Sequence, residues 1–193
     1  GYARGRWPIL AVVAAVSAVA VYSALRWTAS SHTSSVLPGP VPPVSAALAS
    51  NATVLRVVDG DTVDVRIGGH RERIRLIGIN TPETVDPRKP VQCYGPEASA
   101  YTKHLLTPGT PVLLERDTEP RDDYGRLLAY IHRSTDGLFV NLDLAENGFA
   151  VPLRIEPNTG HATEFQAASD RARQARRGLW AACPQPDSDS VAS

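Results

Sequence analysis

The sequence predicts an α+β fold in which a small closed β-barrel is accompanied by three helices. Residues 53–79 alternate between apolar and polar side chains and are interrupted by Asp59-Gly60 and Gly68-Gly69, as is typical of antiparallel strands joined by tight turns. Further along, apolar residues recur at helical spacing between glycine and proline signals. These observations favour a barrel whose strands come mostly from the first half of the domain.

The elements follow in order along the chain. Strands are expected at residues 53–58, 62–67 and 71–79, forming an antiparallel meander, and again at 112–115 and 127–132. A helix should begin at Gly95-Pro96-Glu97 and end before Pro108-Gly109. Two more should cover 139–147 and 162–177, the last with Phe165, Ala168, Ala172 and Ala175 on one side and Gly178 as its C-cap. Five strands with a helix inserted after the third match a barrel of the OB type.

The N-terminal segment, residues 1–27, is expected to be a membrane anchor or a signal peptide. Residues 7–27 contain a single charge and are close to the roughly 20 residues that span a bilayer. Two arginines precede them, which favours a cytoplasmic N-terminus. Ala18-Val19-Ala20 resembles a signal-peptidase cleavage site, so a cleaved signal peptide is the alternative. The chain begins with Gly1 and contains no Met, which is compatible with further residues before it.

The rest of the chain divides by composition. Residues 28–50 are rich in Ser, Pro and Ala and read as an extended linker, residues 51–183 as the folded domain, and residues 184–193 as a disordered tail. We expect either a single-pass protein of the cell membrane with an extracytoplasmic C-terminal domain, or a protein secreted after signal cleavage. Residues 51–183 carry 17 Lys and Arg against 18 Asp and Glu, so a strongly basic field for binding nucleic acid is absent.

The two cysteines, Cys93 and Cys183, predict one disulfide if the domain lies outside the cytoplasm. Two unpaired thiols are the alternative. A metal site is not favoured, because two cysteines without nearby histidines supply too few ligands.

A set of polar residues stands at strand ends. Arg75 is expected on the same strand face as Ile77 and Ile79, where a guanidinium needs a partner or a task. Asp61 follows the first hairpin turn, and Asn80-Thr81-Pro82-Glu83 follows the third strand. Asp59 is read as a turn residue only.

These residue types supply one chemistry. The oxygens of Asp61, Asn80 and the Thr81 carbonyl suit Ca²⁺, and Glu83 can deprotonate water. Two arginines, Arg75 and Arg126, can oppose the charge of a five-coordinate phosphorus. The set therefore indicates phosphodiester hydrolysis.

The sequence resembles the staphylococcal nuclease (thermonuclease) family over essentially all of residues 51–183. The matching stretches are Val58-Asp59-Gly60-Asp61-Thr62-Val63, Arg75-Leu76-Ile77-Gly78-Ile79-Asn80-Thr81-Pro82-Glu83, Tyr94-Gly95-Pro96-Glu97-Ala98-Ser99-Ala100, Asp123-Tyr124-Gly125-Arg126-Leu127-Leu128-Ala129-Tyr130 and Arg177-Gly178-Leu179-Trp180. They occur in the family's order.

The resemblance implies an OB-fold barrel with three helices and a calcium-dependent nuclease that cuts DNA and RNA and leaves 3′-phosphates. By position it implies catalytic roles for Arg75, Glu83 and Arg126, and calcium ligation by Asp61, Asn80 and Thr81. Tyr124, within the fourth stretch, is the candidate substrate-binding residue, and we expect a monomer.

Three positions depart from the family's pattern. Asn80 stands where the family usually has aspartate, so a weaker calcium affinity is expected. Leu153 and Ile155 stand where the family has tyrosines, so base stacking should be poorer. Asp123 replaces a basic residue. The rival interpretation is a non-catalytic OB-fold module that binds single-stranded nucleic acid at the cell surface.

Overall fold

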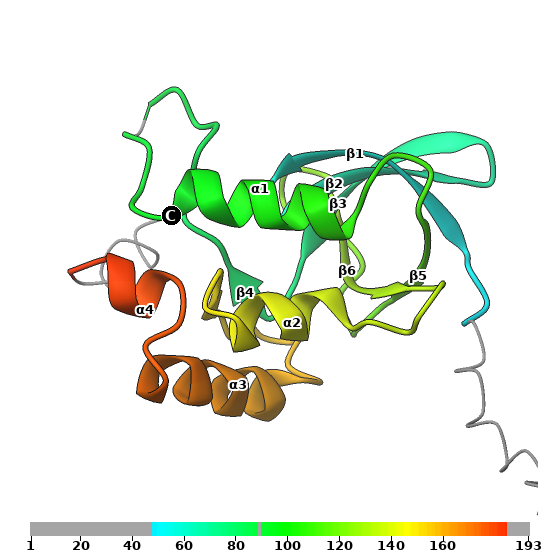
Figure 1. Cartoon of the computed structure of the whole chain (residues 1–193). Helices are drawn as coiled ribbons and strands as arrows, with labels where there is room; N and C mark the ends of the chain where they lie inside the picture. The colour runs from blue at the N-terminus through cyan, green and yellow to red at the C-terminus, as the bar shows by residue number, and fades with distance from the viewer. Residues whose placement is uncertain (1–47, 89, 185–193) are drawn as a thin grey trace, which may run out of the picture. The chain divides into compact units, whose positions relative to one another are not determined.

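The computed structural model describes residues 48–88 and 90–184 (Figure 1). The predicted anchor or signal segment 1–27, linker residues 28–47 and tail residues 185–193 lie outside the described residues. Within the described part, no helix combines the length and the apolar character needed to cross a membrane.

A closed five-stranded barrel forms the centre of the fold and confirms the predicted α+β class. Its strands are β1 (Ala52–Asp59), β2 (Thr62–Ile67), β3 (His70–Leu76), β5 (Pro111–Glu115) and β6 (Leu127–Arg133), in the order β1-β2-β3-β6-β5. β1 also pairs with β5, which closes the barrel. All pairings are antiparallel except β3 with β6.

The interior of the barrel is apolar because alternate residues of each strand point inward. Val63 and Val65 of β2 and Ile74 and Leu76 of β3 are fully buried. Ile131 of β6 is buried with them in the same core. The predicted two-residue alternation therefore fixes which side of each strand faces the core.

The third strand is shorter than predicted. β3 ends at Leu76, and Ile79–Asn80 forms the separate strand β4, which pairs with β7 (Val151–Pro152). Gly78 interrupts the strand with a φ of 80°, and a Cβ there would lie 2.1 Å from the Phe165 ring. The prediction that Arg75 shares a strand face with Ile77 and Ile79 is therefore wrong, because alternation does not continue past Leu76.

The helices lie outside the barrel (Figure 1). They are α1 (Gly95–Leu105), α2 (Val140–Glu146), α3 (Ala162–Gln174) and the single turn α4 (Leu179–Ala182), and α2 packs against α3. The predicted third helix was too long. α3 ends at Gln174, Ala175 is exposed, and Gly178 precedes α4 instead of capping α3.

The predicted disulfide is present between Cys93, just before α1, and Cys183, just after α4. Their Cα atoms are 5.9 Å apart, and the bridge closes a loop with a sequence separation of 90 residues. It therefore joins the C-terminal end of the described fold to the segment that leads from β4 into α1.

Candidate active site

One cleft, with a volume of about 1030 Å³, brings the sequence-predicted site residues together. It is lined by the β1–β2 turn, the segment from β3 through β4 to the loop before α1, and the turn before β6. All seven predicted catalytic, metal and substrate-binding residues line it: Asp61, Arg75, Asn80, Thr81, Glu83, Tyr124 and Arg126. Residues separated by up to half of the domain therefore face a common space.

The β1–β2 turn is held close to the segment after β4. A Cβ on Gly60 would lie 2.6 Å from Thr81 Oγ1, so only glycine permits this approach. The Thr102 hydroxyl of α1 donates to the Gly60 carbonyl at 2.7 Å. The backbone N–H of Thr81 in turn donates to Asp61 Oδ2 at 2.9 Å. These contacts fix the Asp61 carboxylate beside Thr81.

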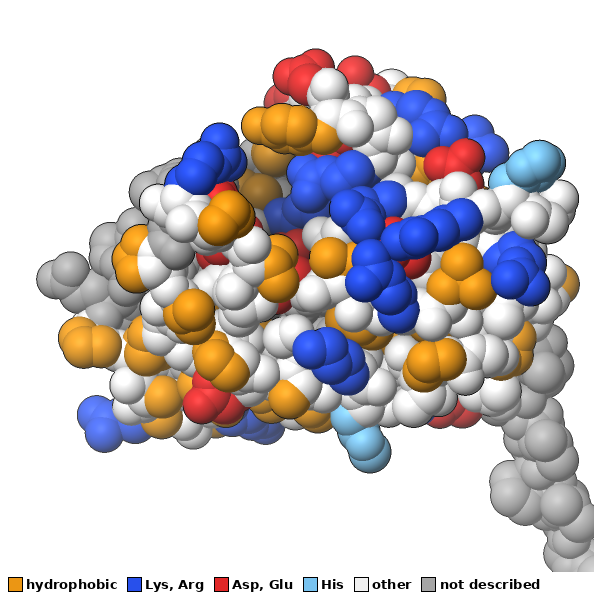
Figure 2. Space-filling view, turned by 90° about the horizontal axis from the view of Figure 1, so that it is seen from above, with side chains coloured by type: hydrophobic (Ala, Val, Ile, Leu, Met, Phe, Trp, Pro, Cys, Tyr) orange, Lys and Arg blue, Asp and Glu red, His pale blue; other side chains and the backbone are white. Residues whose placement is uncertain are grey.

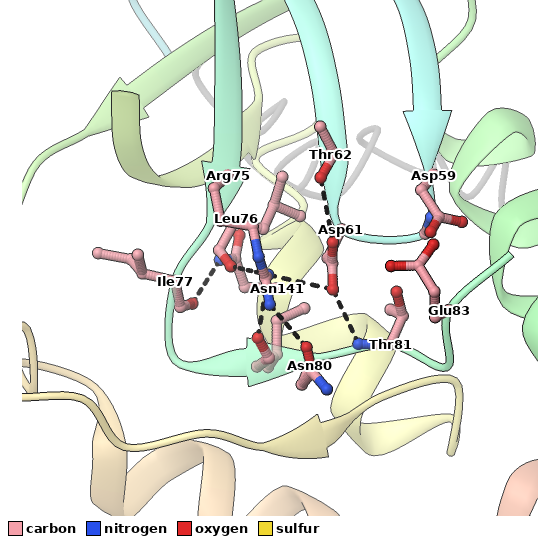
Figure 3. A network of polar contacts seen from close by, with 12 residues as sticks. Asp59, Asp61, Thr62, Arg75, Leu76, Ile77, Asn80, Thr81, Glu83 and Asn141 are labelled. Carbon is pink, nitrogen blue, oxygen red and sulfur yellow. Dashed lines mark hydrogen bonds and ion pairs between the residues drawn. The ribbon is translucent and has the colours of Figure 1, made fainter. Parts of the chain in front are cut away.

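Arg75 lies at the centre of the network in Figure 3. Its Nη1 is 3.1 Å from Asp61 Oδ2, and its Nη2 donates to Asn80 Oδ1 at 2.7 Å. Nη1 also donates to the carbonyl oxygens of Leu76 at 2.6 Å and Ile79 at 3.2 Å. The guanidinium thus has an ionic partner and three further acceptors, which explains how this arginine is accommodated with only 13% of its side chain exposed.

The oxygens around Arg75 are compatible with a hard cation. Asp61 and Asn80 each present a side-chain oxygen to the Arg75 guanidinium, and the buried Thr81 Oγ1 has no hydrogen-bond partner in the described structure. No cluster of three or more His, Cys, Asp or Glu able to hold a metal occurs among residues 48–88 and 90–184. A cation here would depend on carboxylate, amide and backbone oxygens with retained water, a ligand set that Ca²⁺ accepts.

Glu83 is held by the backbone of its own loop. Its Oε1 accepts N–H bonds from Thr84 at 2.9 Å, Val85 at 2.7 Å and Asp86 at 3.1 Å. Its own N–H donates to the Gln92 side chain at 2.7 Å, next to the disulfide-bonded cysteine. Burial alone would raise the pKa of Glu83, but hydrogen bonds, among them those from the three backbone N–H groups, outweigh it and lower the pKa below its ordinary value. The carboxylate is therefore ionised at neutral pH.

Asp59 has a larger part than the turn role predicted for it. Its carboxylate accepts the Thr84 hydroxyl at 2.6 Å and the Gly60 N–H at 2.8 Å. It faces the Glu83 carboxylate (Figure 3). Burial, together with the neighbouring Glu83 and Asp61 carboxylates, raises the pKa of Asp59.

Arg126 is positioned from the turn that precedes β6. Its Nε donates to Asp122 Oδ2 at 2.6 Å, and Asp122 Oδ1 accepts the backbone N–H groups of Tyr124 and Arg126. The Arg126 guanidinium lies 5.4 Å from the centre of the Tyr124 ring. Tyr124 is 85% exposed at the rim of the cleft. An exposed aromatic ring beside a fixed guanidinium can contact a base or sugar next to a bound phosphate.

Several residues that shape the site were not predicted. Asp122 and Gln92 hold Arg126 and the Glu83 loop, respectively. Buried Asn141 of α2 donates to the Ile77 carbonyl at 2.9 Å and accepts the Ile131 N–H at 2.9 Å, linking α2 to the segment after Arg75. The only local signal was the Asp122 position four residues before Arg126, because the other contacts depend on tertiary structure.

The cleft is also lined by Leu153 and Ile155, the aliphatic residues noted at the tyrosine positions of the family pattern. Ile155 is exposed and offers no aromatic face. Asp123 also lines the cleft, beside Tyr124. The three departures therefore lie in or at the edge of the space that holds the predicted site.

Comparison with known proteins places this arrangement in a family. Residues 73–182 match the family described as staphylococcal nuclease homologue. The chain is 44% identical over 127 residues to a thermonuclease of Staphylococcus intermedius, covering 66% of this chain and 74% of that protein. It is 39% identical over 143 residues to a thermonuclease of Staphylococcus hyicus, covering 72% and 83%. Endonuclease YncB of Bacillus subtilis is 37% identical over 131 residues, covering 67% and 61%. The chain belongs to the staphylococcal nuclease homologue family.

Proposed function

We propose that the protein is a nuclease that hydrolyses phosphodiester bonds of DNA or RNA in this cleft. The observation that carries the proposal is the convergence of Glu83, Arg75 and Arg126 on one space next to the Asp61 carboxylate. Kinship with thermonucleases and an endonuclease supports the same activity.

Glu83 is the proposed general base. Its lowered pKa keeps it ionised, and the three N–H donors on Oε1 fix the carboxylate in one orientation. It takes a proton from a water molecule whose oxygen attacks phosphorus. The bond from phosphorus to the 5′ oxygen breaks, solvent protonates the leaving oxygen, and a 3′-phosphate remains.

Arg126 and Arg75 are the proposed phosphate-binding residues. Asp122 holds Arg126 through Nε, so its two terminal nitrogens can fork onto phosphate oxygens. Arg75 is held by Asp61, Asn80 and backbone carbonyls, and it supplies a fixed positive charge at the floor of the cleft. Positive charge held in place before the reaction stabilises the extra charge of five-coordinate phosphorus.

Ca²⁺ is the proposed cofactor. Asp61, Asn80 and the Thr81 carbonyl would hold it, and the partnerless Thr81 Oγ1 marks an oxygen-rich position at the same place. When bound, the ion would neutralise phosphate charge and polarise water. We also propose that the domain acts outside the cytoplasm, anchored or secreted, because the Cys93–Cys183 disulfide suits an oxidising compartment.

The test is degradation of single-stranded DNA by the purified chain, with added calcium and with a chelator. Calcium-dependent loss of full-length DNA is expected, with 3′-phosphate ends on the products. Tight binding of the DNA without cleavage would instead support the non-catalytic module, which the uncharged Asn80 at a proposed calcium ligand position favours.

A further inference from the structure

A second charged group lies next to the residues described above, on the outer face of β1, β2 and β3. Asp64 of β2 is 1% exposed, yet it is a carboxylate on a strand whose inward residues are Val63 and Val65. It stands directly opposite Arg56 of β1 in one pairing and Arg73 of β3 in the other. Its burial therefore comes from arginine side chains that cover it.

Three arginines bind this single carboxylate, and we call Arg56, Arg71 and Arg73 the arginine cluster. Arg56 Nε donates to Asp64 Oδ2 at 2.8 Å, and Arg73 Nε donates to Oδ1 at 2.9 Å. Arg71 Nη2 also donates to Oδ2. One negative charge therefore holds three positive ones, and the group keeps a net charge of +2.

The cluster is fixed on one side and open on the other. The side chains of Arg56, Arg71 and Arg73 remain 58%, 56% and 44% exposed. In the described structure these three guanidinium groups donate hydrogen bonds only to Asp64. Arg56 and Arg71 each use one nitrogen, and Arg73 uses two. A guanidinium has five N–H donors, so each arginine has donors directed to solvent.

A further positive charge lies beside the cluster. Arg66 stands directly opposite Arg71 on the same face, a like-charge pair that a sheet does not favour. Glu72, the acidic residue of β3, lies on the other face of the strand and is paired with Arg121 at 3.1 Å. Basic side chains gather on one face of the molecule in Figure 2. In a domain whose overall charge is close to neutral, this is a local anion-attracting surface.

The cluster continues directly from the cleft. Arg71, Arg73 and Arg75 are alternate residues of β3, so they share its outer face at a spacing of about 7 Å. Asp64, Arg71 and Arg73 line the same cleft as Arg75 and Glu83. A chain with regularly spaced negative charges that enters at Arg75 would pass over Arg73 and Arg71 next.

We propose that the arginine cluster is a binding subsite for the sugar–phosphate backbone of a single nucleic-acid strand beyond the bond that is cut. Asp64 organises the subsite by holding three guanidinium groups in fixed positions. The subsite binds phosphate without reading base sequence, because its donors meet only the backbone. This inference rests on the proposed nuclease function, whose cleft supplies the neighbouring phosphate position.

The test uses Arg71→Gln and the double variant Arg71→Gln/Arg73→Gln. The control is Arg171→Gln, which removes the same charge from an exposed arginine that is paired with Glu146 outside the cleft. Binding of a labelled 20-nucleotide single strand is measured as salt is varied, in the Glu83→Gln background, where cleavage is slowed at least about a hundredfold. Near-ultraviolet circular dichroism verifies folding of each variant.

The logarithm of the association constant decreases linearly with the logarithm of the salt concentration. The slope of this line should become less steep by about 0.7 for Arg71→Gln and by about 1.4 for the double variant. Each lost contact should weaken the affinity about eightfold at 50 mM salt. A dinucleotide, too short to reach the cluster, should bind all variants alike. With Glu83 restored, KM for the long strand should rise while kcat is unchanged. If the folded Arg71→Gln and double variants have the same salt dependence of binding and the same KM as Arg171→Gln, the proposed subsite is refuted, even if nuclease activity is intact. Conversely, the slope changes would uphold it even if no cleavage is found.

Discussion

Arg75 donates a 2.7 Å hydrogen bond from Nη2 to Asn80 Oδ1, so the proposed phosphate-binding arginine and a proposed calcium ligand contact each other directly. The same guanidinium lies 3.1 Å from Asp61. The charge at position 80 therefore affects both the proposed calcium ion and Arg75 in this part of the cleft.

Changing Asn80→Asp should tighten calcium binding. A second carboxylate beside Asp61 adds attraction for a divalent ion, which is largely offset by repulsion between the carboxylates and by competition from Arg75. A net gain of about 1 kcal/mol, or several-fold in Kd, is expected. Calorimetric titration of both proteins measures it, with Asp61→Asn as the control that should weaken binding. If the aspartate variant binds calcium no better, Asn80 is not a ligand.

Asp122 is expected to act by positioning Arg126. Replacing Asp122→Asn keeps an oxygen for the backbone N–H groups but removes the charged acceptor of Arg126 Nε. Loss of orientation should lower kcat by about tenfold while the fold is retained. Asp123→Asn, one residue away, removes the same charge and should leave kcat close to wild type. Equal effects of the two variants would refute the positioning role.

Asp64 should make the folded state sensitive to acid. Burial by itself would raise its pKa, but hydrogen bonds from Arg73, Arg71 and Arg56 outweigh it and lower the pKa from 3.8 to about 2. The unfolded chain then binds this proton at a higher pH than the folded protein, so its contribution to stability is present above pH 4 and is lost as pH falls towards 2. Urea unfolding from pH 2 to 7 should show this loss in the wild type, and a smaller one in Asp64→Asn. Parallel curves for the two proteins would contradict it.

The disulfide should stabilise the fold and the Glu83 loop together. Cys93 adjoins Gln92, whose side chain accepts the Glu83 N–H. Replacing both cysteines by serine should lower the free energy of unfolding by about 2–5 kcal/mol. Reducing agent should bring the wild type to the same value and leave the double variant unchanged. Insensitivity of the wild type to reduction would show that the bridge has no such role in solution.

Local pattern was sufficient for much of the fold. The Asp59-Gly60 turn between alternating residues predicts β1 and β2 to within a residue, because both signals are local. The break at Gly78 was missed, since its reason, the Phe165 ring, lies far away in sequence. The end of α3 was missed because Gly178 marks the start of a further turn.

The site residues also differ in whether local sequence signals predict them. The seven cleft residues were predicted through motifs, but the parallel pairing of β3 with β6, which places Arg75 opposite Leu128, has no local signal. The arginine cluster depends on the register of three strands, including an irregularity between Val54 and Arg56. Alternation alone cannot fix such a register, so Asp64 was not distinguished from other strand carboxylates.

The role proposed for Glu83 is that of the base in phosphodiester hydrolysis. It is tested most directly by single-turnover cleavage of one oligonucleotide, at saturating calcium, by wild type and Glu83→Gln. Glutamine keeps the shape of the side chain and an oxygen for the loop N–H groups but cannot accept the proton of water. The rate should fall at least about a hundredfold while oligonucleotide affinity is kept. An unchanged rate in the folded variant would contradict the mechanism.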